Sequence, residues 1–231
     1  MIDRYTLIAT PDRLAERFNA ENTEPHRPQY NAGPGRLLPV ILQHSPQGIS
    51  YFYWGAPPAQ GKNKSLAEKI INLRAESIGD KPVFQKKLRH YRCLIPADGF
   101  FVWKQIGKKT ATPYRVVRTD KSLFSIAGVW EEYQQEDGEH VHTFTMITTP
   151  TGDELHRIAE RMPAVLTLEM EKTWMDREAD QALLLSLLQP APLSWESYTV
   201  SPRITSTEAN EASLILPAPA ANQFGNLTLF D

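Results

Sequence analysis

Short apolar runs separated by turn residues dominate the pattern of this chain. Strand-like runs cover residues 92–95, 100–103, 114–117, 123–130 and 141–149. The last run alternates apolar and polar positions, which is typical of a strand with one buried face. Two earlier runs, 39–44 and 49–55, flank the turn sequence Ser45-Pro46-Gln47-Gly48 and predict a β-hairpin. A further strand is expected late in the chain, over residues 197–204.

Helical signals are fewer than strand signals. Thr10 is followed by Pro11 and Asp12, an N-cap pattern that predicts a short helix through Phe18. Residues 65–68 (SLAE) form a capping box, so a helical turn should begin there. The pattern leaves open whether that helix continues through Asn72 or gives way to a strand at residues 70–71. Helices are also predicted over residues 153–160 and 178–188, the second of which carries a leucine stripe.

The order of these elements predicts the fold class. Helices and strands do not alternate strictly, which favours an α+β fold with a mixed, barrel-like β core flanked by short helices. A chain of 231 residues is long enough for one domain with a substantial core. We place that domain at residues 1–217. The Pro-Ala-Pro-Ala-Ala run and the polar residues after it predict a poorly ordered tail at residues 218–231.

The composition indicates a soluble protein of the cytoplasm. Hydrophobic residues make up 41% and charged residues 23% of the chain, as in ordinary globular domains. No apolar run has the length of a membrane helix, and the first residues lack a secretory signal pattern. The single cysteine, Cys93, cannot form an internal disulfide and is expected to be a small buried residue.

The net charge of −2 conceals an uneven distribution. Residues 60–92 hold nine Lys or Arg and three acids, a local net charge of +6, whereas residues 153–231 have a local net charge of −7. Such a segregation can build a positive face for phosphate groups. A solvated lysine-rich surface explains the same pattern, so charge alone does not decide between the two interpretations.

Three segments combine apolar residues with polar groups that a core would not select. They are residues 71–77 (INLRAES), 92–103 (RCLIPADGFFVW) and 158–163 (IAERMP). Polar side chains among apolar neighbours need partners, so such segments tend to mark a site. The chain has no glycine-rich phosphate loop and no serine-nucleophile motif, and nothing in it indicates a cofactor. His140 and His142 share one face of a predicted strand, but without an acidic partner in register we interpret them as a surface pair rather than a metal site.

Together with residues 28–34 (PQYNAGP), 127–131 (AGVWE) and 144–149 (FTMITT), these segments follow one another along nearly the whole chain. In that order they resemble the SOS-response-associated peptidase (SRAP) family. The resemblance implies an SRAP-type domain that recognises abasic sites in single-stranded DNA during the DNA damage (SOS) response. It also implies crosslinking, lyase and autopeptidase activities. Family members use a cysteine after the initiator Met, a motif glutamate and a motif histidine, and the cysteine forms a thiazolidine with the opened sugar.

All three reactive groups of the family are replaced in this chain. Ile2 stands at the cysteine position, Val102 at the glutamate position and Ala159 at the histidine position, and Asp3 occupies the place of the usual glycine. An isoleucine offers no thiolate, and valine and alanine transfer no proton. We therefore expect a pseudoenzyme that binds single-stranded, abasic or junction DNA without forming the thiazolidine.

The residues that bind without reacting look retained. The resemblance implies that Asn72 contacts the sugar and that Arg74 and Arg161 contact phosphate oxygens. It also implies that Trp54 is a possible stacking platform for bases, and that Pro34 and Met162 belong to the same DNA groove. A second aromatic residue expected after Trp54 is absent from residues 56–59 (APPA).

Several alternatives remain open on the sequence alone. The α-amine of Met1 could form a Schiff base with the abasic aldehyde and promote strand cleavage, because this step needs only an amine. The groove could instead serve protein interaction. Arg161 could be a structural ion-pair residue, Asn72 could cap local backbone, and His156 could act as a substitute base.

Overall fold

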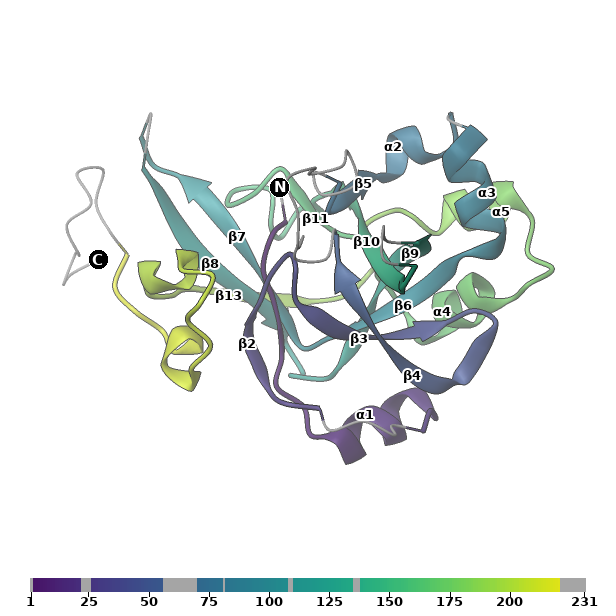
Figure 1. Cartoon of the computed structure of the whole chain (residues 1–231). Helices are drawn as coiled ribbons and strands as arrows, with labels where there is room; N and C mark the ends of the chain where they lie inside the picture. The colour runs from purple at the N-terminus through teal and green to yellow at the C-terminus, as the bar shows by residue number, and fades with distance from the viewer. Residues whose placement is uncertain are drawn as a thin grey trace.

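Two β-sheets form the centre of the molecule and short helices lie around them (Figure 1). The computed structural model describes residues 2–21, 26–55, 70–80, 82–107, 110–134 and 138–220. The first sheet has five strands in the order β13-β8-β7-β1-β2. These strands are β13 (Trp195–Thr199), β8 (Ala111–Arg118), β7 (Gly99–Gln105), β1 (Tyr5–Leu7) and β2 (Gln29–Ala32).

The second sheet closes on itself. Its strands are β3 (Leu37–Leu42), β4 (Ser45–Trp54), β5 (Asn72–Arg74), β6 (Arg92–Ala97), β9 (Phe124–Gln134), β10 (His140–Pro150), β11 (Arg161–Pro163) and β12 (Val165–Leu166). Strand β9 pairs with both β6 and β10, and β10 also pairs with β4, so the path β10-β4-β3-β6-β9 returns to β10. The predicted α+β fold with a barrel-like core is therefore confirmed.

Short helices flank this core, as predicted. They are α1 (Pro11–Phe18), α2 (Ala75–Ile78), α3 (Pro82–His90), α4 (Leu168–Met175) and α5 (Gln181–Ser186), with two 3-10 turns at Pro202–Thr205 and Ala212–Ile215. The Thr10 side chain accepts a hydrogen bond from the Arg13 amide, so α1 begins where its cap pattern predicted. No described helix is long and apolar enough to cross a membrane.

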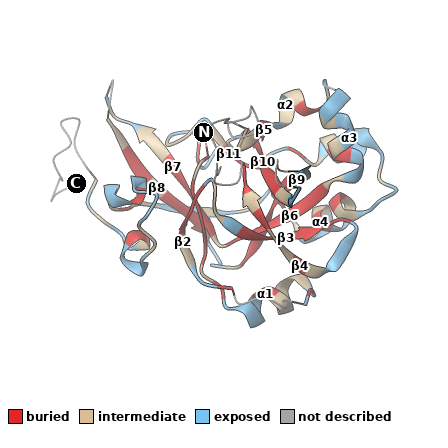
Figure 2. Ribbon diagram, viewed as in Figure 1, coloured by how far each residue is buried: buried red, intermediate tan, exposed pale blue. Residues whose placement is uncertain are grey.

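Buried residues line the strands of both sheets (Figure 2). Arg92 lies among them and is completely buried. Its guanidinium donates to the carbonyls of Trp174 at 2.6 Å and Asp176 at 2.5 Å and to the carbonyl of Leu88. Arg92 therefore caps the carboxyl ends of α3 and α4 from inside the core. The prediction that counted Arg92 in the basic segment is corrected, because a buried arginine adds nothing to a positive surface.

The strands were predicted better than the helices. The hairpin of β3 and β4 is confirmed, and β6 to β10 cover every strand-like run predicted between residues 92 and 149. The helix predicted over residues 153–160 is wrong, because this segment is a series of turns that connects antiparallel β10 and β11. Its ends are joined by the Thr151 amide, which donates to the Glu160 carbonyl at 3.1 Å. A return within so few residues leaves no room for a regular helix.

Three other predicted elements differ in extent. Helix α5 begins only after Asp180, whose side chain caps the Leu183 amide at 2.7 Å. The late strand ends at Thr199, because Pro202 begins a 3-10 turn. Ala218, which begins the predicted tail, donates to the Thr199 carbonyl at 2.9 Å. The capping box at residues 65–68 and residues 221–231 lie outside the described residues.

Candidate functional site

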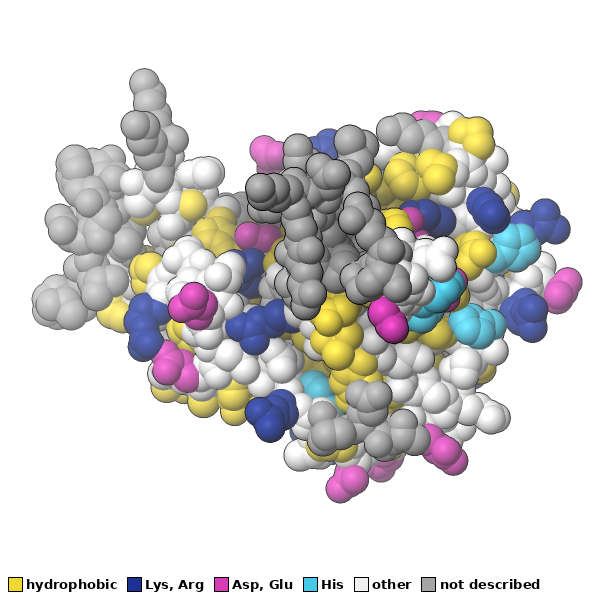
Figure 3. All heavy atoms as spheres, in the orientation of Figure 1, with side chains coloured by type: hydrophobic (Ala, Val, Ile, Leu, Met, Phe, Trp, Pro, Cys, Tyr) yellow, Lys and Arg dark blue, Asp and Glu magenta, His cyan; other side chains and the backbone are white. Residues whose placement is uncertain are grey.

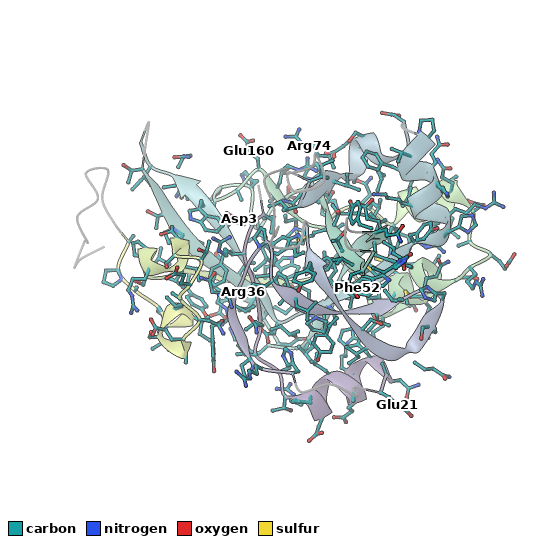
Figure 4. The ribbon with its side chains drawn as sticks, in the orientation of Figure 1. Asp3, Glu21, Arg36, Phe52, Arg74 and Glu160 are labelled. Carbon is teal, nitrogen blue, oxygen red and sulfur yellow. The ribbon has the colours of Figure 1, made fainter. Side chains whose placement is uncertain are left out.

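Strand β10 brings the candidate polar residues together. Asn72 and Arg74, the ends of β5, pair in parallel with Met146 and Thr148 of β10. Arg161 begins β11, which pairs with the end of the same strand through Pro150. Figure 4 shows Arg74 and Glu160 at the upper edge of the view with Asp3 below them. The segments at 71–77 and 158–163, far apart in the sequence, thus flank one strand.

Residue 2 lies against Asn72. The Asn72 Nδ2 atom donates to the Ile2 carbonyl at 2.5 Å, and the Ile2 side chain packs into the core with 2% of its surface exposed. Asn72 therefore does more than cap local backbone, since it holds the start of the chain from 70 residues away. Its Oδ1 atom is buried and has no hydrogen-bond partner.

Asp3 carries a second unpartnered acceptor. Its Oδ1 atom is buried without a hydrogen-bond partner, although 40% of the side chain is exposed. Burial raises the pKa of the Asp3 carboxyl, and the charge of Arg4 opposes this shift. Asp3 and Asn72 thus each carry a buried acceptor oxygen without a hydrogen-bond partner.

Val102 and Ala159 offer no polar group where the family resemblance places a glutamate and a histidine. Val102 lies in β7 and is 2% exposed. The adjoining part of β7 runs beside the start of the chain, because the Phe101 amide donates to the Arg4 carbonyl at 3.1 Å. Ala159 is half-buried in the β10–β11 connection, where its carbonyl accepts from the Thr151 hydroxyl at 2.8 Å.

Arg161 forms a two-pronged ion pair. Its guanidinium donates to both carboxylate oxygens of Glu76, at 2.8 and 2.9 Å, and to the Thr148 carbonyl at 2.7 Å. This hydrogen bonding lowers the pKa of Glu76. The structural reading of Arg161 is thus supported, and a phosphate would have to share this arginine with Glu76. Glu76 was missed in the sequence, although it stands two residues after Arg74 in the same segment.

Arg74 differs from Arg161 in being exposed, and its side chain makes no hydrogen bond to any other part of the chain that the structure describes. Pro34 is also exposed, in the turn between β2 and β3. In that turn a Cβ atom at residue 33 would lie 3.1 Å from the Arg4 guanidinium, a tight contact that glycine avoids. Arg74 and Pro34 are therefore both accessible to a ligand.

The placement of Trp54 does not fit its predicted stacking role. The indole is completely buried, with its Nε1 atom donating to the Ile71 carbonyl at 2.9 Å. The rings of Tyr5 and Phe144 lie on it with centroid distances of 5.4 and 6.3 Å. Alternation along β4 directs Trp54 into the closed barrel, where no base can reach it. Met162 is also buried, at 1% exposure, in the wall of a cavity of about 310 Å³.

The remaining candidates have structural surroundings. Cys93 is buried as predicted, and burial raises the pKa of its thiol. His156 is exposed and its Nδ1 atom lies 2.5 Å from the Asp153 carbonyl in its own turn. His140 and His142 do have an acidic partner in register, because each bonds Glu132, at 3.0 and 2.8 Å. No group of three potential ligands with metal-binding geometry occurs among the described residues.

Comparison with known proteins agrees with this architecture. The family model for the SOS response associated peptidase (SRAP) matches residues 1–207. This chain belongs to the SRAP family. It is 36% identical to the abasic site processing protein YoqW of Bacillus subtilis over 221 residues, which covers 93% of this chain and 99% of that protein. It is 26% identical to the abasic site processing protein YedK of Escherichia coli, covering 88% of this chain and 92% of that protein.

Solved structures of two bacterial proteins share the fold. A Bacteroides thetaiotaomicron protein superposes with a TM-score of 0.81 at 25% identity, covering 93% of this chain and 99% of that one. A Bordetella bronchiseptica protein gives a TM-score of 0.71 at 23% identity, covering 86% of this chain and 99% of that one. The SRAP-type fold predicted for this chain is therefore shown, with its barrel and short helices.

Proposed function

We propose that this SRAP protein of the cytoplasm binds abasic single-stranded DNA as part of the DNA damage response and forms no covalent thiazolidine with it. The observation that carries the proposal is the state of residue 2. It is an isoleucine, its side chain is buried, and Asn72 holds its carbonyl. Relatives covering nearly the same length are named abasic site processing proteins, which supports DNA with abasic sites as the ligand.

The residues at the site divide into binding groups and lost reactive groups. Asn72 holds the Ile2 carbonyl, and 40% of the next side chain, Asp3, is exposed to a ligand. Exposed Arg74 suits a phosphate oxygen. Val102 and Ala159 supply no acid or base, so proton transfer to or from the sugar has no side chain at these positions.

Trapping gels with abasic single-stranded DNA test the chemistry. We expect no adduct that survives heating and denaturing electrophoresis, because no thiolate stands at residue 2. A heat-stable adduct formed without reductant would overturn the proposal. A complex that appears only after borohydride treatment would favour the alternative activity, a Schiff base at the Met1 amine, and peptide mapping should then find the modification at Met1.

The same gels run without denaturant test the binding itself. Affinity should fall steeply with salt, since each phosphate contact releases counterions. Arg74→Ala should weaken binding about tenfold, which corresponds to one charge-assisted contact. Arg13→Ala is the matched control, because Arg13 is equally exposed but lies on α1, away from β5. Equal affinities of both variants and the unchanged protein would place the DNA elsewhere or favour a protein-interaction role.

A further inference from the structure

A cluster of rings lies where strands β4, β9 and β10 leave the barrel. Trp130 is its centre, with ring centroids 5.0 Å from Tyr91, 5.3 Å from His44 and 5.5 Å from Phe52. His142 stacks on Phe52 at 4.8 Å, with 18° between the ring planes. We call these residues the ring cluster: His44, Phe52, Tyr91, Trp130 and His142.

The ring cluster is not part of the closed core. His44 is exposed, and Tyr91, Trp130 and His142 are half-buried, whereas Phe52 at 6% exposure joins the cluster to the core. The Trp130 Nε1 atom has no hydrogen-bond partner. Figure 3 shows histidine side chains gathered on this face near Lys and Arg side chains. Half-buried ring faces around a buried, unpaired N–H are unusual for a closed core.

Cations lie beside the rings. The last turn of α3 carries Lys87, Arg89 and His90, and the His90 ring contacts Tyr91 at 6.4 Å. A cavity of about 610 Å³ adjoins this turn, and its cationic lining comes from Lys86, Arg89 and Arg177. The acids facing the same region are Glu131, paired with Lys87 at 2.6 Å, and Glu132, bonded to His140 and His142. Glu178 and Asp180 also line the cavity.

We propose that the ring cluster is a stacking site for unpaired nucleobases of a single strand that continues from the proposed abasic site. This inference rests on the proposed function. Ring faces next to cations are the combination that binds single strands without sequence preference. Strand β10 connects the two places, because His142 and Thr148 are six residues apart, roughly 20 Å along a strand. A few nucleotides can span that length.

Fluorescence anisotropy with single strands of increasing length tests this site. Each strand carries one tetrahydrofuran abasic analogue with flanks of one to eight nucleotides on either side. We expect affinity to increase with flank length on one side and then level off. Trp130→Ala should weaken binding of the long strand about tenfold, as expected for one stacked base, and leave the affinity for the short strand unchanged. Trp130→Phe should restore most of it, because phenylalanine keeps a ring face.

The controls separate this proposal from the function on which it depends. Trp103→Ala removes a half-buried indole from β7, outside the cluster, and should not change the length dependence. Thermal unfolding of each variant confirms folding, and His44→Ala repeats the test at an exposed position. Short strands that bind without any length gain, or a gain that survives both Trp130→Ala and His44→Ala, would overturn the stacking site while leaving the proposed function intact. If the unchanged protein does not bind the short abasic strands at all, the proposed function itself is overturned.

Discussion

At the scale of single residues, Asp3 is the replaced residue of the site with the largest consequences. The resemblance to the family implies glycine at this position, and Asp3 adds a titratable group one residue after Ile2, whose carbonyl Asn72 holds. Burial raises the pKa of Asp3 above 3.8. A raised pKa means that the protonated carboxyl stabilises the fold below pH 3.8, and that this contribution is lost as the pH rises through the folded value.

The variant Asp3→Asn should therefore be more stable than the unchanged protein at neutral pH. It should also lack the decline in stability that Asp3 causes as the pH rises through its raised folded pKa. Urea unfolding at a series of pH values measures both effects, with Asp153→Asn, an exposed acid in the β10–β11 connection, as the control. The same variant should bind DNA more tightly, because a negative charge beside the sugar site is removed. Identical pH profiles for Asp3→Asn and the unchanged protein would show that ionisation of Asp3 does not destabilise the fold.

At the scale of elements, a buried carboxylate joins two helices to the barrel. Glu171 of α4 accepts two hydrogen bonds from Arg17 of α1, at 2.6 and 3.1 Å, and a third from Ser125 of β9 at 2.7 Å. The glutamate side chain is 9% exposed and the arginine side chain 21%. Removing one partner of such a pair leaves the other charge partly buried and unpaired.

Glu171→Ala should thus lower the free energy of unfolding by about 3 kcal/mol. Glu169→Ala in the first turn of the same helix should cost less than about 1 kcal/mol, since that exposed acid acts mainly on the helix dipole. Chemical denaturation compares the two. Arg17→Ala combined with Glu171→Ala should cost less than the sum of the single changes. A strictly additive double variant would mean that the ion pair does not connect α1 to α4.

The elements also show what local patterns could and could not predict. Alternation and turn residues were sufficient for the β3–β4 hairpin and β10, because side-chain direction in a strand follows directly from sequence parity. Helix α4 was missed although Thr167 caps the Met170 amide at 3.3 Å, since its cap is followed by a mixed apolar and acidic stretch. The stacking role predicted for Trp54 does not fit its burial. The alternation of side chains along a strand does not show whether the apolar face lines an open groove or a closed barrel.

At the scale of the whole molecule, the site depends on contacts between distant segments. Asn72 with Ile2, and Arg161 with Glu76, join residues 70 and 85 positions apart. The family motifs predicted which residues gather there, but not that Glu76 would occupy Arg161 or that Asp3 and Asn72 would leave two acceptors unpartnered. Such pairings follow from the register of β5 and β11 on β10, which no single segment encodes.

Restoring the family's reactive groups tests whether the molecule as a whole remains a working scaffold. The variant carries Ile2→Cys, Asp3→Gly, Val102→Glu and Ala159→His. Cysteine after the initiator Met is small enough to permit Met removal, which exposes thiol and amine together. We expect a partial yield of heat-stable adduct with abasic single-stranded DNA, because Asn72 and Arg74 are still in place.

Stability limits this experiment and also sharpens it. Ile2 and Val102 are each 2% exposed, so a glutamate at residue 102 costs several kcal/mol unless it gains a hydrogen-bond partner. Circular dichroism and thermal unfolding must therefore show a folded variant before adducts are scored. The matched control keeps Ile2 and carries the other three changes, and it should form no adduct. A folded fourfold variant without adduct would show that the pocket differs from its relatives beyond these four positions, with Glu76 on Arg161 and the buried indole of Trp54 as the first places to change.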